Sequence, residues 1–71
     1  MSQISRDDEV FIRIGEVCQM VGMSRSTIYR LMEDGDFPQQ VNISQNIVAW
    51  VKAEVVAWSN DRIARRTAPQ R

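Results

Sequence analysis

The sequence predicts a mainly helical fold with one small β-hairpin, in the arrangement of a winged helix-turn-helix domain. Three observations support this prediction. Gly22 stands between two stretches whose apolar residues recur at helical spacing. Two short β-prone segments, 41–43 and 47–50, enclose a polar turn. An amphipathic stretch at 51–66 then returns to a period of about 3.6 residues.

The composition is that of one small folded domain. The chain has 71 residues, of which 44% are hydrophobic and 25% are charged, and these values are typical of globular proteins. We expect a flexible N-terminal arm at residues 1–9, a folded domain at 10–66 and a flexible tail at 67–71. A domain of this size is close to the lower limit for a stable apolar core, so association with a partner is expected to contribute to its stability.

The first two elements are a short edge strand at residues 10–14 and a helix at 15–21. Val17 and Val21 are four residues apart and therefore lie on one face of this helix. Cys18, the one cysteine of the sequence, lies beside them. It is expected to be a small core residue rather than a reactive thiol, and it has no second cysteine for an internal disulfide.

The second helix begins after Ser24, whose side chain is suited to an N-cap, and extends to about residue 34. Its inward face is formed by apolar residues three and four apart, namely Ile28, Leu31 and Met32. Gly35 then ends the helix in a left-handed conformation.

A loop and a β-hairpin follow the second helix. Pro38 excludes helix at Phe37, which we expect to be buried beneath the loop. Residues 41–43 and 47–50 are the two strands of the hairpin, or wing. Asn46 lies in its turn and tolerates the left-handed conformation that a tight turn requires.

The third helix, at residues 51–66, is expected to pack on the core with one side. Its inward side has the apolar residues Val51, Val55, Val56, Trp58 and Ile63. Its outward side has most of the charged residues, Lys52, Glu54, Asp61 and Arg62. Trp50 and Trp58 have the largest apolar side chains, and we expect them to form the core rather than to stack on bases.

The polar side of the second helix points to a function. Six side chains remain on the outside once the inward residues are assigned: Ser24, Arg25, Ser26, Tyr29, Arg30 and Glu33. Helix-turn-helix proteins place the N-terminal part of this helix in the major groove of DNA, where such groups bond phosphates and base edges. The candidate DNA-binding residues are therefore Ser24, Arg25, Ser26, Thr27, Tyr29 and Arg30.

These residue types are compatible with more than one kind of contact to DNA. Arg25 and Arg30 can each bind a guanine through two parallel hydrogen bonds or bind one phosphate. Tyr29 can contact a thymine methyl group or a phosphate. The alternative is an ordinary solvated surface, in which Ser24 is only a cap and Glu33 pairs with Arg30. The face as a whole favours DNA binding, because an ordinary surface helix more often mixes Lys, Glu and Gln.

A second set of candidate contacts lies outside the second helix. It comprises Gln45 and Asn46 in the wing, and Arg62, Arg65 and Arg66 at the end of the third helix. The arginines are at least equally well explained as cations next to a helix C-terminus. Nine Lys and Arg balance nine Asp and Glu, so DNA binding is expected to be weak or to require several copies.

Other classes of function are disfavoured. The sequence has no histidine, and it lacks a metal-ligand cluster and a glycine-rich phosphate loop, so we expect no enzyme activity, cofactor or metal. It has no apolar run approaching the roughly 18 residues of a membrane span and no leader-like start. We therefore expect no membrane contact and a cytoplasmic location.

The order of these motifs resembles the AlpA family of phage-type regulators, which are similar to excisionases and to MerR-like winged helices. The likeness spans about residues 12–66 and depends on Gly22, the run 24–32, Gly35, Phe37, Pro38, Trp50, Glu54, Val55 and Trp58. It implies that DNA is recognised by Ser24, Arg25, Ser26, Thr27, Tyr29 and Arg30. The family commonly has a Gly-Gly-Arg type wing tip, whereas residues 44–46 of this chain are Ser-Gln-Asn, without the cation.

The resemblance implies a sequence-specific DNA-binding transcriptional regulator of a prophage or integrated island that controls an integrase or excision gene. Its partners would be double-stranded DNA, an integrase or RNA polymerase, and further copies of itself on DNA. One alternative is an excisionase that bends DNA at an attachment site. Another is a protein-interaction adaptor that uses the helix-turn-helix face, and the salt dependence of DNA binding distinguishes it.

Overall fold

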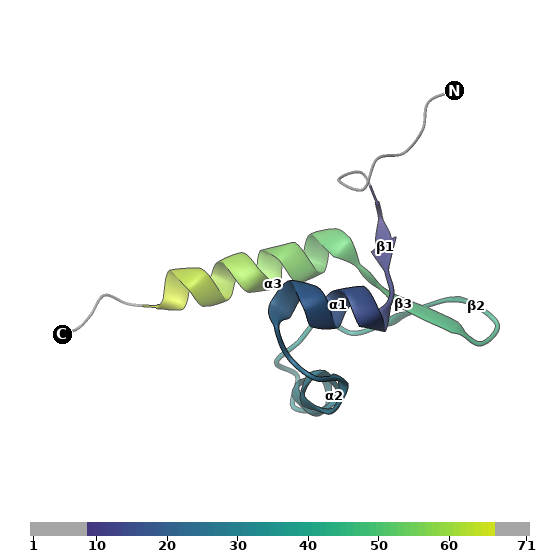
Figure 1. Ribbon diagram of the computed structural model, residues 1–71, viewed down its shortest axis with the longest axis horizontal. Coiled ribbons are helices and arrows are strands. Elements are labelled where there is room, and N and C mark those ends of the chain that lie inside the picture. The colour runs from purple at the N-terminus through teal and green to yellow at the C-terminus, as the bar shows by residue number, and fades with distance from the viewer. Residues whose placement is uncertain (1–8, 67–71) are drawn as a thin grey trace, which may run out of the picture.

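A computed structural model describes residues 9–66 of the chain. This part contains three helices and three strands, which are labelled in Figure 1, and they confirm the winged helix-turn-helix prediction. The elements are β1 Phe11–Ile12, α1 Ile14–Val21, α2 Arg25–Glu33, β2 Val41–Ser44, β3 Ile47–Val51 and α3 Lys52–Arg65. The expected N-terminal arm, except Glu9, and the expected tail at 67–71 lie outside the described residues.

The three strands form one antiparallel sheet in the order β1, β3, β2. The expected edge strand is present as β1, in which Ile12 pairs with Trp50 of β3. Strands β2 and β3 form the wing, and Asn46 in its turn has the expected left-handed conformation, with a φ of 66°. Strand β3 therefore joins the wing to the segment that precedes α1.

The turn between α1 and α2 has the predicted backbone conformation and the predicted N-cap. Gly22 has a φ of 70°, and its N–H donates to the Cys18 carbonyl at 2.8 Å. Most residues with a Cβ would be strained at this φ, so the glycine allows α1 to end where it does. Ser24 then caps α2, because its Oγ accepts a hydrogen bond from the Thr27 N–H at 3.3 Å.

The C-terminal end of α2 is a Schellman motif. Gly35 has a φ of 77°, and its N–H donates to the Met32 carbonyl at 3.0 Å. The Asp36 N–H donates to the Leu31 carbonyl at 2.8 Å, which completes the motif. The chain reverses at this point, and Phe37 enters the core as predicted.

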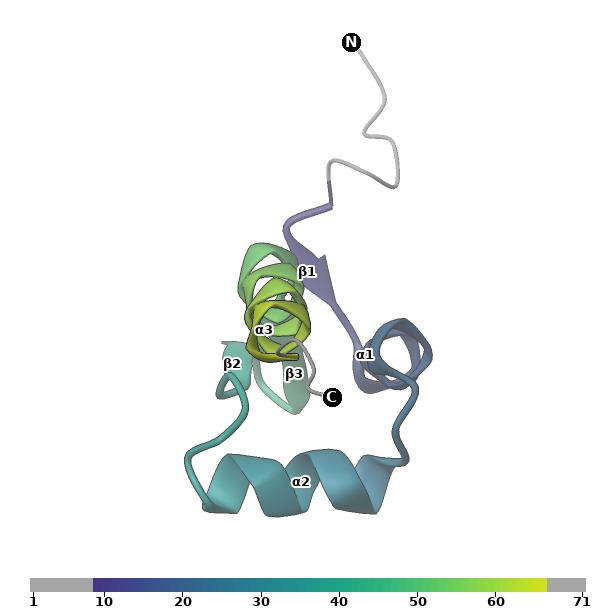
Figure 2. The same ribbon diagram turned by 90° about the vertical axis from the view of Figure 1, so that its left-hand side faces the viewer.

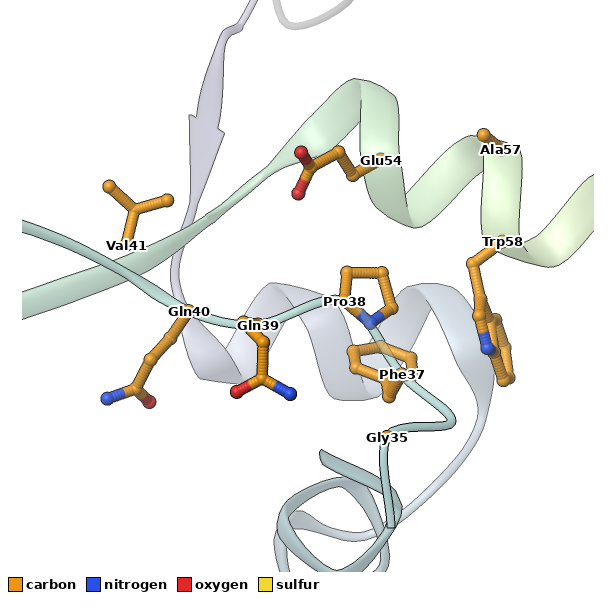
Figure 3. Close-up of a pocket in the computed structure, with 9 residues that line it drawn as sticks. All are labelled: Gly35, Phe37, Pro38, Gln39, Gln40, Val41, Glu54, Ala57 and Trp58. Atoms are coloured by element: carbon orange, nitrogen blue, oxygen red, sulfur yellow. The ribbon is translucent and has the colours of Figure 1, made fainter. Parts of the chain in front are cut away.

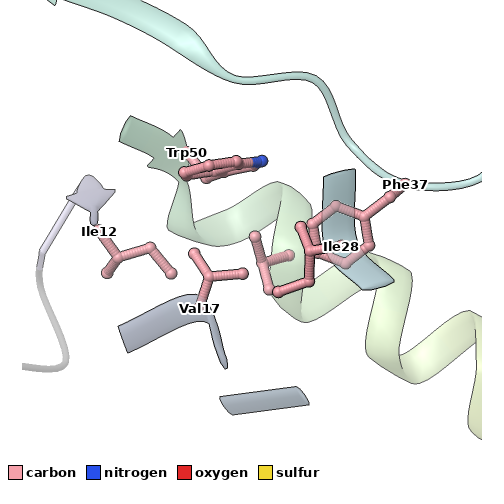
Figure 4. Packing of buried hydrophobic residues seen from close by; sticks show 6 residues of the cluster. Ile12, Val17, Ile28, Phe37 and Trp50 are labelled. Atoms are coloured by element: carbon pink, nitrogen blue, oxygen red, sulfur yellow. The ribbon is translucent and has the colours of Figure 1, made fainter. Parts of the chain in front are cut away.

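The core takes one side chain from nearly every element. Its six members are Ile12, Val17, Ile28, Phe37, Trp50 and Val55, and Figure 4 shows how they lie against one another. Trp50 is fully buried, as predicted, and its Nε1–H donates to the Pro38 carbonyl at 3.1 Å. One cluster therefore holds both helices of the helix-turn-helix, the wing and α3 together.

The inward side of α3 differs from the prediction. Val55 is fully buried and Trp58 half-buried, but Val56 is 39% exposed and Ile63 56% exposed. The prediction that Val56 and Ile63 face the core was wrong, because the inward line runs through Val55, Trp58 and Arg62. Figure 1 shows α3 extending past the other elements, so its last turns have little to pack against.

Candidate nucleic-acid interface

Helix α2 lies at the edge of the molecule, and Figure 2 shows it below α1 and the sheet with one side turned away from them. Ile28 anchors its inward side and is fully buried. Its opposite side, here called the α2 outer face, is exposed and consists of Arg25, Ser26, Tyr29, Arg30 and Glu33. The structure therefore brings most of the first set of candidate residues together on one solvent-facing surface.

The N-terminal end of α2 is rich in hydroxyl groups. Ser24 Oγ lies 3.0 Å from Thr27 Oγ1 and 3.4 Å from Ser26 Oγ. The first turn has no acidic side chain, and the first backbone N–H groups of any helix lack acceptors within it. Free amides, the helix dipole and these hydroxyls together favour a bound anion such as a phosphate.

Tyr29 is partly held by the core. Its ring centroid lies 6.2 Å from that of Trp50 at an interplanar angle of 52°, yet 40% of the residue is exposed. The contact with Trp50 limits the positions that the ring can take. Tyr29 therefore presents a defined apolar surface and a hydroxyl on the α2 outer face.

The two arginines of the α2 outer face are exposed. Among residues 9–66, Arg30 forms no ion pair with Glu33, so the pairing considered as the alternative to DNA binding is not formed. The acidic residues Glu33, Asp34 and Asp36 are at the C-terminal end of α2. Arg25 lies in the first turn of α2 and Arg30 in the last turn, just ahead of these acidic residues, so the positive charge that favours phosphate contact at the N-terminal end comes from Arg25.

The wing tip lies far from the end of α3. Gln45 and Asn46 are both exposed, and Figure 1 shows the hairpin at the opposite end of the molecule from the last turn of α3. Ile43 and Ile47 flank the turn and are 44% and 38% exposed. The tip therefore offers amide groups and aliphatic side chains for contact but no charge.

The three candidate arginines at the end of α3 differ in their surroundings. The Arg62 guanidinium lies 4.8 Å from the centroid of the Trp58 ring, and its Nη2 donates to the Asp36 carbonyl at 3.2 Å. Arg65 Nε lies 3.1 Å from Asp61 Oδ2. Arg66 is exposed. These arginines are not part of the α2 outer face. Arg62 already has a role within the fold.

Arg62 is part of a clasp that joins α3 to the loop after α2. The clasp is formed by Trp58, Arg62 and the Asp36 carbonyl. Trp58 Nε1–H donates to this carbonyl at 2.6 Å, so the oxygen accepts hydrogen bonds from both side chains. The Phe37 and Trp58 rings meet edge to face at 4.8 Å between centroids. Figure 3 shows the two rings side by side at one end of an open groove of about 870 Å³ between the loop and α3.

The clasp was not predicted from the sequence, although a signal for it existed. Trp58 and Arg62 are four residues apart in a helix, which is the spacing at which side chains meet. An indole N–H that is not fully exposed also needs an acceptor. The acceptor, however, is a backbone carbonyl 22 residues away in sequence. No local pattern identifies it.

The Trp58→Phe substitution tests the clasp. It removes the indole N–H but keeps a ring against Phe37, so we expect the free energy of unfolding to fall by about 1 kcal/mol. For a domain of this size, that is a decrease of roughly 4 to 8 °C in Tm. Thermal unfolding followed by circular dichroism measures it, with Gln45→Ala as a surface control. Equal Tm values for the native chain and Trp58→Phe would mean that the hydrogen bond contributes nothing.

Residues 9–66 contain no group of three or more His, Cys, Asp or Glu side chains that could hold a metal ion. No helix in this range is both long and apolar enough to cross a membrane.

Comparison with known proteins identifies a family and a relative of this chain. The family model described as Prophage CP4-57 regulatory protein (AlpA) matches residues 10–63. The uncharacterised protein ORF88 of Enterobacteria phage P4 is 50% identical over 58 residues, which cover 82% of this chain and 66% of that protein. The family match includes α1, α2, the wing and most of α3. The chain therefore belongs to the AlpA family of prophage regulatory proteins, as its motifs indicate.

Proposed function

We propose that this protein is a sequence-specific DNA-binding transcriptional regulator of a prophage or integrated island, and that the N-terminal half of α2 enters the major groove. One observation carries the proposal. Helix α2 is anchored by the fully buried Ile28 on one side, while its other side exposes arginine, hydroxyl and tyrosine groups. Membership of a family of prophage regulatory proteins supports the same conclusion.

The dimensions and charges of α2 fit this use. An α-helix with its side chains is about 10 to 12 Å across, and the major groove is about 12 Å wide. The hydroxyl-rich end formed by Ser24, Ser26 and Thr27 would meet a phosphate, while Arg25 and Arg30 would contact guanine edges or phosphates. The acidic end of the helix would point away from the backbone of the duplex.

The proposed target is a gene for integration or excision of the element, and an integrase or RNA polymerase is the proposed protein partner. This step follows from the resemblance to phage-type regulators. It also implies action in the cytoplasm, where bacterial DNA lies.

The test is selection of bound fragments from random duplex DNA, followed by titration of the best fragment at several salt concentrations. We expect one enriched sequence motif, and a logarithm of affinity that falls with the logarithm of salt concentration by about 0.9 for each phosphate neutralised. Failure to bind any duplex at low salt would overturn the proposal and favour the adaptor. A footprint on native DNA then separates a promoter site from repeated sites beside an attachment site, which would indicate an excisionase.

A further inference from the structure

Strand β2 has one free edge. It pairs with β3 on one side, and in the described part of the chain no strand lies on its other side. An edge strand presents unpaired backbone N–H and C=O groups, which proteins normally protect with charges, proline or a bulge. Residues 37–51 have no charged side chain, and the irregular pairing between Asn42 and Ser44 protects only the half near the wing tip. Val41 and the two glutamines before it therefore remain open to pairing with another extended chain.

A groove lies directly beside this open edge. It is the groove of about 870 Å³ between the loop after α2 and α3, and its apolar walls come from Phe37, Pro38, Val41, Ala57 and Trp58. Figure 3 shows Pro38, Gln39 and Gln40 continuing the line of β2 along the groove, with α3 on the other side. Because Val41 lines the groove, side chains on the same face of a strand added next to β2 would also face it.

The groove contains one charged residue, Glu54. Its side chain is exposed, and it forms no ion pair within residues 9–66. A Lys or Arg of an occupant would be attracted to this carboxylate, and an acidic residue would be repelled. The groove therefore favours an occupant that is basic at this point.

The spacing along α3 matches that of an extended chain. Glu54 and Trp58 are four residues apart, which is about 6 Å along a helix. Side chains two residues apart in a strand lie on the same face, about 6.6 Å from each other. One extended segment can therefore place a basic residue beside Glu54 and a large apolar residue against Trp58 and Phe37, with one residue between them.

We infer that the free edge of β2 and this groove bind an extended segment of another protein, which adds a strand next to β2. The segment has a Lys or Arg two residues from a large apolar residue. Backbone hydrogen bonds to β2 supply affinity, and Glu54 and the aromatic walls of the groove supply specificity.

This site is separate from the α2 outer face and does not depend on DNA binding. Figure 2 shows α3 and the sheet on the other side of α2 from its outer face. A copy bound to DNA through α2 would therefore keep the groove open to a protein partner. The site goes beyond the proposed function because it gives the chemistry of the segment that such a partner would contribute.

The first experiment selects peptides that bind the full chain. A display library of random 12-residue peptides is selected on the immobilised protein without DNA, and the best peptide is synthesised and titrated by fluorescence anisotropy. We expect enriched peptides with a Lys or Arg two residues from a large apolar residue. Glu54→Lys should weaken binding of the best peptide by about five-fold or more.

Glu16→Lys is the matched control for this variant. Glu16 and Glu54 are each the acidic residue in the first turn of their helix, but Glu16 does not line the groove, so its substitution should leave the affinity unchanged. A peptide with its basic residue replaced by Glu should lose affinity for the native chain and regain it for Glu54→Lys. Absence of any enriched peptide, or an affinity that Glu54→Lys does not change, overturns the inference.

The second experiment tests whether the peptide pairs with β2 as a strand. Successive N–H groups of an extended chain point to opposite edges, so only alternate amides of the peptide can donate to β2. Two versions of the best peptide are N-methylated, one at odd and one at even positions. We expect one version to lose binding at least ten-fold and the other to retain most of it. Equal affinities of the two versions would contradict strand addition.

Two controls separate this site from the DNA site and from another occupant. The double variant Arg25→Ala and Arg30→Ala should bind the peptide like the native chain, and a loss of peptide affinity in it would place the peptide on α2 instead and overturn the inference. Analytical ultracentrifugation measures self-association. A native dimer that becomes monomeric in Glu54→Lys would make a second copy the occupant and would also overturn the inference.

Discussion

The Trp50→Ala variant is expected to lose its cooperative unfolding transition. Trp50 is fully buried at the point where both helices of the helix-turn-helix, the wing and α3 meet. Removing a buried side chain of this size costs about 3 to 5 kcal/mol. A domain of this length has a total stability of roughly 4 to 10 kcal/mol, so the loss consumes much or all of it. Urea titration and thermal melting followed by circular dichroism measure the effect.

Trp50→Phe is the matched variant for this prediction. It keeps an aromatic ring in the core but removes the N–H that donates to the Pro38 carbonyl at 3.1 Å. We expect it to fold and to lose about 1 to 3 kcal/mol, from the missing hydrogen bond and the smaller ring. A Trp50→Ala protein that melts like the native chain would contradict the core described above.

The second large effect is expected for the double variant Arg25→Ala and Arg30→Ala. Each arginine that contacts a base edge contributes about 1 to 3 kcal/mol of discrimination, so losing both would weaken specific binding by roughly 30-fold or more. Both side chains are exposed, so Tm should change little. Titration of the selected duplex by fluorescence anisotropy measures affinity, and circular dichroism measures Tm.

Two further variants test whether the loss of affinity is specific to the arginines of α2 and which kind of contact Arg25 makes. Arg13→Ala removes one positive charge from an exposed residue that precedes α1, and it should change affinity much less than either arginine of α2. Arg25→Lys keeps the charge but loses the planar fork. It should weaken binding if Arg25 contacts a guanine, and retain most of the affinity if Arg25 contacts a phosphate. Unchanged affinity in the double variant would exclude the α2 outer face as the DNA site.

The helix-turn-helix and the wing could be predicted because their signals are local. Gly22, Ser24, Gly35 and Asn46 each determine the conformation of their own few residues, and each has the geometry that its residue type favours. The inward and outward sides of α2 follow from the spacing of Ile28 and its apolar neighbours. Most of the first set of candidate DNA contacts could therefore be assigned from the sequence.

The orientation of α3 could not be predicted in the same way. Apolar residues occur on two sides of this helix, so periodicity leaves open which side faces the core. The choice depends on contacts with distant residues, such as the hydrogen bond from Trp58 to the Asp36 carbonyl. Val56 and Ile63 were for this reason assigned to the core. Arg62, assigned to the outward side, instead lies against Trp58.

Methylation interference on the selected duplex tests most directly whether α2 enters the major groove. Dimethyl sulfate modifies guanine at N7, which lies in the major groove, and adenine at N3, which lies in the minor groove. We predict that methylation of at least one guanine N7 prevents binding of the native chain. Binding that is blocked only by adenine N3 methylation, or by neither modification, would contradict the placement of α2 in the major groove.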